Sequence, residues 1–156
     1  MHIFLLFLAT ITTTLLGAAL YFIPVDLLFH FYFGLIATVA ALLTHTWIFF
    51  YFIGTGEGIR EGVLAHKLET DAIRLTKKFK GRTFPFALFS MIFLILTSIL
   101  GGALRFGKVA PAWHWGMALF AILFNFFSFR QEYRVIQENR ALMTDLNAQI
   151  DAKIAS

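Results

Sequence analysis

The 156-residue chain contains no cysteine, only three prolines and 14% charged residues. Without cysteine it cannot form disulfides, thiolate metal sites or cysteine-ligated iron–sulfur clusters. A soluble domain has roughly 25% charged residues, whereas here 59% of the residues are hydrophobic and twenty are phenylalanine. The composition therefore excludes an ordinary soluble domain, and membrane topology explains the net charge of +4 better than nucleic-acid binding does.

Charged residues are also missing from four long stretches of the sequence, which are 1–25, 27–56, 83–104 and 109–129. A helix needs about 20 apolar residues to cross a bilayer, where only helices and closed barrels satisfy their backbone groups. These stretches lack the alternating pattern of barrel strands. The sequence predicts one all-α domain, an integral membrane four-helix bundle with spans near 3–23, 27–53, 84–104 and 111–130.

Basic residues are distributed unevenly between the two sides of these spans. Segment 57–82 and the tail after residue 129 are rich in lysine and arginine, whereas the other side has only Arg105 and Lys108. Basic residues favour the cytoplasmic side of a membrane. We therefore expect both termini in the cytoplasm, and the membrane to be a bacterial cytoplasmic membrane.

Two segments outside the spans also have helical patterns. Apolar residues three to five positions apart predict an amphipathic cytoplasmic helix over 57–82, whose basic face would bind anionic lipid or dock a partner. The tail at 131–154 is predicted to continue span 4 as a protruding helix. Its partial heptad of apolar residues predicts contact with a second copy of the chain or another membrane subunit.

Familiar catalytic patterns do not occur in the predicted spans. They contain no Asp or Glu, which excludes a carboxylate pair or a Ser-His-Asp triad at membrane depth. The glycine-rich string 54–58 lacks the Gly-Lys-Ser/Thr end of a phosphate loop and is predicted to be a flexible exit from span 2. We do not expect the chain to be an enzyme by itself.

Two histidines are predicted to lie at the same depth in different spans. His30 lies about one and a half turns into span 2, and His114 lies about one turn into span 4 from the same side. Glycines share this level and two cations lie just outside it: Gly34, Gly101, Gly102, Arg105 and Lys108.

This arrangement has the parts of a haem b site. Imidazoles from facing helices can be the two axial ligands, glycines admit a flat macrocycle, and Arg105 and Lys108 would pair with the propionates. The sequence thus predicts a haem-binding membrane electron carrier or cytochrome-like subunit. The same residues also fit simple helix packing, which would make the chain a cofactor-free accessory or scaffold subunit. A small transporter or channel is the third alternative.

A third histidine, His45, is predicted to lie about 22 Å from His30 along the same helix. Thr10, Ser90 and Asn125 reach comparable depths. The main interpretation is therefore a neutral histidine hydrogen-bonded within a polar layer. The alternative is a second metal site, which lacks an obvious second histidine within the membrane.

Overall fold

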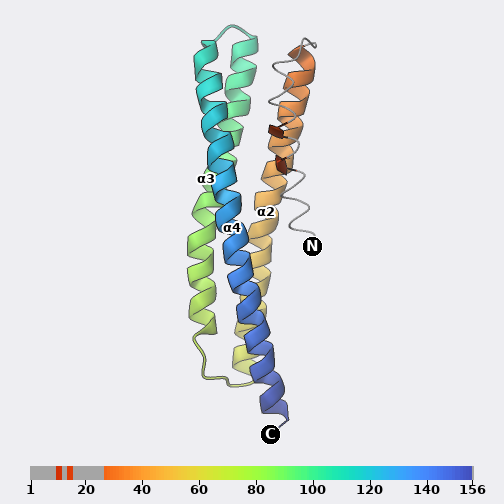
Figure 1. Ribbon diagram of the computed structural model, residues 1–156, viewed down its shortest axis with the longest axis vertical. Coiled ribbons are helices and arrows are strands. Elements are labelled where there is room, and N and C mark those ends of the chain that lie inside the picture. The colour runs from red at the N-terminus through yellow and green to blue at the C-terminus, as the bar shows by residue number, and fades with distance from the viewer. Residues whose placement is uncertain (1–9, 12–13, 16–26, 156) are drawn as a thin grey trace.

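The computed structural model describes residues 10, 11, 14, 15 and 27–155, and all regular structure in this part is helical. Helices α2 (Leu27–Ala65), α3 (Ala72–Arg105) and α4 (Pro111–Ile154) run along the long axis of the molecule (Figure 1). The all-α prediction is confirmed, and these three helices are long and apolar enough to cross a membrane. Most of predicted span 3–23 lies outside the described residues, so a four-helix bundle is not shown.

The turn between α3 and α4 is defined by a glycine and a proline. Gly107 has a φ of 65°, a left-handed conformation that suits glycine because it has no side chain. Its N–H donates to the Leu104 carbonyl at 2.9 Å, and the Lys108 N–H donates to the Ala103 carbonyl at 2.9 Å. These bonds satisfy carbonyls that the end of a helix leaves free. Pro111 then begins α4, where its missing N–H costs nothing.

The glycine-rich string and segment 57–82 both differ from their predicted structures. The string 54–58 is helical throughout, because α2 continues to Ala65 rather than ending near residue 53. Segment 57–82 is not one amphipathic helix, since non-helical residues 66–71 separate α2 from α3. Ile59, Val63, Ala72 and Phe79 of its apolar stripe are buried inside the protein, and lipid contact by this segment stays a prediction.

Residues 54–82 and 130–155 together form what we call the charged end of the molecule. Its core is a cluster of Ile59, Val63, Ala72 and Leu146, contributed by α2, α3 and α4. As predicted, α4 runs unbroken from Pro111 to Ile154. The tail does not project free, however, because its apolar seam packs against the other two helices of the same chain. Contact with a second copy or another subunit stays a prediction.

An ion pair links α3 to α4 at the charged end. The Arg82 guanidinium bonds both carboxylate oxygens of Glu138, with Nη2 3.0 Å from Oε1. Arg134 adds a second contact, with its Nε 3.4 Å from Glu138 Oε1. The hydrogen bond from Arg82 is the main cause that lowers the pKa of Glu138 below its ordinary value.

The stability contribution of this pair should depend on pH. Because the folded state lowers the pKa of Glu138, the contribution is present above the ordinary carboxylate pKa and is lost as the pH falls through the lowered value. The Arg82 and Glu138 side chains are 29% and 34% exposed, so Glu138→Gln should cost only about 0.2–1 kcal/mol at neutral pH. Thermal unfolding in detergent measures this loss, which should vanish in strongly acidic buffer. Equal losses at both pH values would contradict the assignment, and the exposed Glu69→Gln serves as the control.

Candidate functional site

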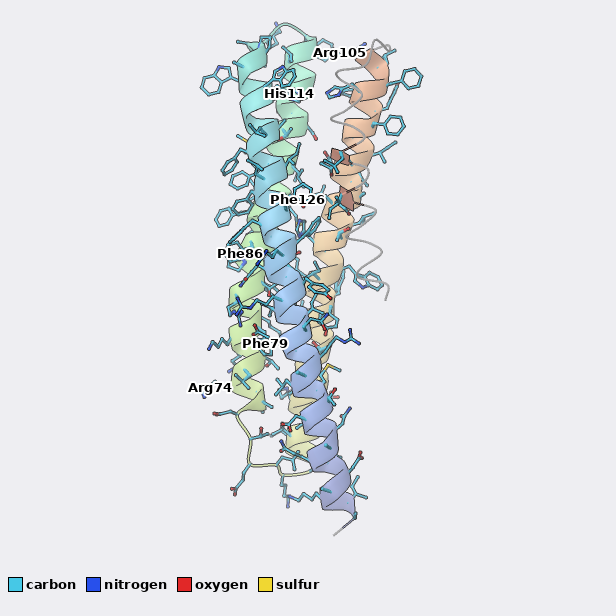
Figure 2. All side chains as sticks on the ribbon, in the orientation of Figure 1. Arg74, Phe79, Phe86, Arg105, His114 and Phe126 are labelled. Atoms are coloured by element: carbon cyan, nitrogen blue, oxygen red, sulfur yellow. The ribbon has the colours of Figure 1, made fainter. Side chains whose placement is uncertain are left out.

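The structure brings His30 of α2 and His114 of α4 together. Their ring centres are 6.3 Å apart, and the ring planes cross at 88°. Both side chains are half-buried. Figure 2 shows His114 near the end of the molecule that carries the α3–α4 turn, close to the level of Arg105. Two imidazoles from separate helices therefore lie next to each other, edge to face, and a haem site built on them stays a prediction.

Helix α3 holds the His114 ring in position through Thr97 and Gly101, which lie one turn apart on one helix face. Nδ1 of His114 lies 3.2 Å from the Thr97 carbonyl oxygen. A carbonyl can only accept, so Nδ1 donates its hydrogen and the neutral ring keeps a lone pair on Nε2. A β-carbon at Gly101 would lie 3.0 Å from Cε1 of His114. Gly101 therefore makes room for the imidazole itself.

The other residues predicted for this site have looser surroundings. Among the described residues, no atom of another helix or side chain lies within 4 Å of the place where a β-carbon would stand at Gly34 or Gly102. Arg105 ends α3 and Lys108 lies in the following turn, and both are exposed. Among the predicted glycines, Gly101 makes the close contact in the described part of the chain.

A second polar site joins α2 to α4 near the middle of the molecule. His45 and Glu132 are both fully buried, and Nδ1 of His45 lies 2.8 Å from Oε1 of Glu132. The ring of Phe129 stacks on His45, with centres 4.9 Å apart. Next to His45, the hydroxyls of Thr44 and Thr10 lie 2.8 Å apart. His45 is thus hydrogen-bonded to Glu132, a carboxylate that is not among the residues predicted for the polar layer around it.

The sequence prediction ends span 4 at Arg130 and so leaves Glu132 outside the membrane-embedded part of α4. The spacing of the tail residues contains a signal for its burial. The partial heptad of the tail consists of Ile136, Met143, Leu146 and Ile150, and Glu132 lies one turn before Ile136 on the same helix face. Arg130 and Arg134, by contrast, are exposed on other faces of α4. Extending the seam backwards would have placed Glu132 inside the protein.

Further polar side chains pair across the helices, from the His30 end to the charged end. The pairs are Thr38 with Ser98, Ser90 with Ser128, and Asn139 with both Tyr51 and Thr55. Two atoms of the second site are not satisfied in this way. Nε2 of His45 and Oε2 of Glu132 are buried and have no hydrogen-bond partner among the described residues.

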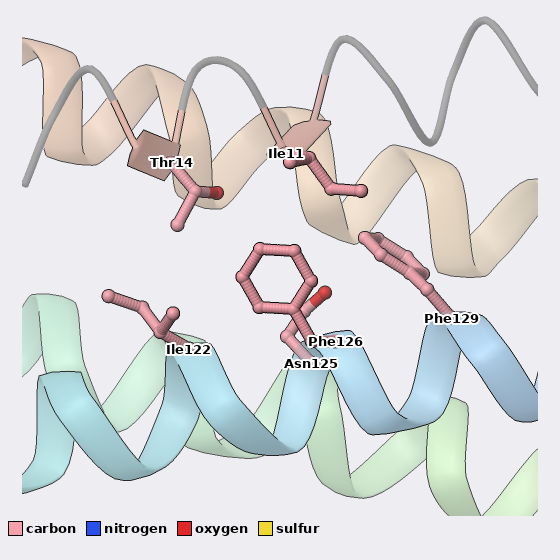
Figure 3. A pocket seen from close by; sticks show the side chains of 6 residues that line it. All are labelled: Ile11, Thr14, Ile122, Asn125, Phe126 and Phe129. Atoms are coloured by element: carbon pink, nitrogen blue, oxygen red, sulfur yellow. The ribbon is translucent and has the colours of Figure 1, made fainter.

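A small cavity borders the Phe129 ring that stacks on His45. It has a volume of about 10 Å³ and lies between residues near the start of the chain and α4 (Figure 3). Thr14 and Asn125 are its polar lining residues. The space is close to the smallest that holds one water molecule.

Neither site gathers enough side chains to hold a bare metal ion. Within residues 27–155 and the four earlier described residues, no three His, Cys, Asp or Glu side chains converge on one point. His45 has its Nδ1 engaged by Glu132. A second metal site at His45 therefore gains no further ligand from the described part of the chain, and a metal at His30 and His114 would need ligands from a cofactor.

Replacing one member of the His45–Glu132 pair should lower the stability of the protein more than replacing both members. Glu132→Met leaves Nδ1 of His45 buried without a partner, which we expect to cost about 1–3 kcal/mol. The double variant His45→Leu/Glu132→Met replaces the pair by apolar side chains and should be more stable than Glu132→Met alone. Thermal unfolding of the single variants His45→Leu and Glu132→Met, the double variant and wild type in detergent gives the coupling energy. A double variant that loses the sum of the single losses would show that the contact contributes nothing.

The chain matches no protein-family model, and comparisons with curated proteins and with solved structures find no significant match.

Proposed function

We propose that this chain is a b-type haem-binding membrane protein that carries electrons, with His30 and His114 as axial ligands. The observation that carries the proposal is the spacing of the two rings. The ring centres are 6.3 Å apart, so the two imidazoles are close enough together that both would bind one haem iron.

The contacts of His114 also support a ligand role. Histidine ligands usually donate their second ring N–H to a carbonyl or carboxylate, which fixes the tautomer and the ring orientation. The bond from Nδ1 to the Thr97 carbonyl does this and leaves Nε2 for the iron. The absence of a side chain at Gly101 lets α3 approach the ring closely enough to form that bond.

Haem suits the site better than a bare ion does. A porphyrin supplies four nitrogens, so the protein needs to add only two axial ligands. Bound haem would supply one-electron chemistry between the reduced and oxidised iron. No described atom of another helix or side chain lies within 4 Å of a β-carbon placed at Gly34 or Gly102, and the exposed Arg105 and Lys108 offer cations to propionates.

The orientation that goes with this function follows from the basic residues. Their abundance at the charged end supports a cytoplasmic location for that end and for both termini. The histidine pair would then lie toward the opposite membrane surface. The basic side chains of segment 57–82 would contact anionic lipid where they reach the bilayer surface.

A visible absorption spectrum of the detergent-purified protein tests the proposal. The wild-type protein, produced with adequate haem supply, should show a Soret band that shifts when dithionite reduces the iron. His30→Ala and His114→Ala should each lose this spectrum, whereas the control His66→Ala, at the charged end, should keep it. A colourless wild-type protein that co-purifies with other membrane proteins would refute haem binding and favour an accessory subunit.

Two adjacent glycines provide a sharper test of the ring position. A β-carbon at Gly101 would press on the His114 ring, whereas one at Gly102 would meet open space. Gly101→Ala should therefore displace the axial ligand and weaken haem retention, and Gly102→Ala should leave it nearly unchanged. Haem retained per protein after gel filtration measures the difference. Equal retention by the two variants would argue against this position of His114.

A further inference from the structure

The His45–Glu132 pair has no part in the function proposed above. Fifteen residues of helix separate His45 from His30, which corresponds to about 22 Å. Both members of the pair are fully buried. Glu132 is the one fully buried glutamate of the five in the chain, the others being Glu57, Glu61, Glu69 and Glu138. A buried ionisable pair at this depth is costly and calls for a role of its own.

The charged side chains around this pair do not balance its charge. On α2 and α3, the stretches 27–56 and 83–104 that lie beside it contain no charged residue. On α4, Arg130 and Arg134 are exposed, and Arg82 of α3 is bonded to Glu138. Tyr51, the neighbouring titratable side chain on α2, accepts a hydrogen bond from Asn139. Within the described residues, the pair must therefore balance its own charge.

The net charge of the His45–Glu132 pair depends on the number of protons that it holds. With a neutral imidazole and an ionised carboxylate, the pair carries a net charge of −1. One further proton makes it neutral, whether that proton is on the imidazole or on the carboxyl group. A net charge buried without other partners is far more costly than a neutral pair. Nε2 of His45 and Oε2 of Glu132 have no hydrogen bonds from described residues to reduce that cost.

We propose that His45 and Glu132 together form a buried proton-binding site, which holds its additional proton at neutral pH and releases it to water at alkaline pH. The hydrogen bond between Nδ1 and Oε1 already contains one proton when the imidazole is neutral and the carboxylate is ionised. The additional proton therefore lies on Nε2 of His45 or on Oε2 of Glu132, the two atoms of the pair that have no hydrogen-bond partner among the described residues. The cavity beside Phe129, with room for about one water molecule, brings solvent-sized space next to the ring that covers His45. The proposal does not depend on haem at the other site.

Infrared difference spectroscopy between pH 6 and pH 10 tests the proposal on the full-length protein in lipid vesicles. The protein is labelled with ¹³C at the side-chain carboxyl of glutamate. Exposed glutamates stay ionised over this range, so a label-sensitive carboxyl change must come from a buried group. We expect one such change in wild type, together with an imidazole band, and loss of the carboxyl change in Glu132→Gln. The matched control Glu61→Gln, at an exposed position, should retain it.

A proton count gives an independent readout. Alkaline titration from pH 7 to pH 10 should release one more proton from wild type than from Glu132→Gln, while Glu61→Gln should match wild type. Absence of any label-sensitive change in wild type would overturn the proposal and leave the pair a fixed structural contact. The wild-type spectra decide this even if Glu132→Gln does not fold. Because neither readout uses haem, failure here would leave the function proposed for His30 and His114 untouched.

Discussion

The arrangement of the helices is governed by an apolar exterior that offers polar side chains no partner. Leucine, isoleucine and phenylalanine are exposed along much of α2, along α3 beyond residue 87 and along the first half of α4. In a bilayer these surfaces gain nothing by packing together, because lipid chains are equally apolar. Hydrogen bonds between helices then contribute to association and register. The pairs Ser90–Ser128 and His45–Glu132 act in this way, because each joins residues of different helices.

The two halves of the molecule are therefore stabilised differently. In the apolar half the helices bury both small and large side chains, with Ala41 and Ala121 beside Leu94 and with Ile48 and Phe52 in one cluster with Phe129. At the charged end the buried apolar side chains are also removed from water, as in a soluble helix bundle. This change explains why α2 and α4 do not stop at the predicted membrane boundary. At the point where α2 and α4 pass from the apolar half into the charged end, they are already packed against neighbouring helices of the same chain.

The spans and the level of His30 and His114 could be predicted because they follow from runs without charge and from a rise of about 1.5 Å per residue. The helical state of the string 54–58 could not, because glycine is a weak helix former and the packing of α2 against its neighbours decides the outcome. A β-carbon at Gly56, for example, would lie 2.9 Å from Nζ of Lys80. The spacing along α4 places Glu132 on the buried face of the helix. Its pairing with His45 could not be predicted, because it required knowing that α2 and α4 lie side by side in parallel.

The unbroken course of α4 has a mechanical consequence. A helix of 44 residues spans about 66 Å, and it contains no interior proline at which it could kink. His114, Glu132 and Glu138 therefore lie on one continuous, stiff helix. A small rotation of α4 about its own axis, applied at the tail, would turn the His114 ring relative to α2. Such a rotation would be transmitted by the helix itself and not through side-chain contacts.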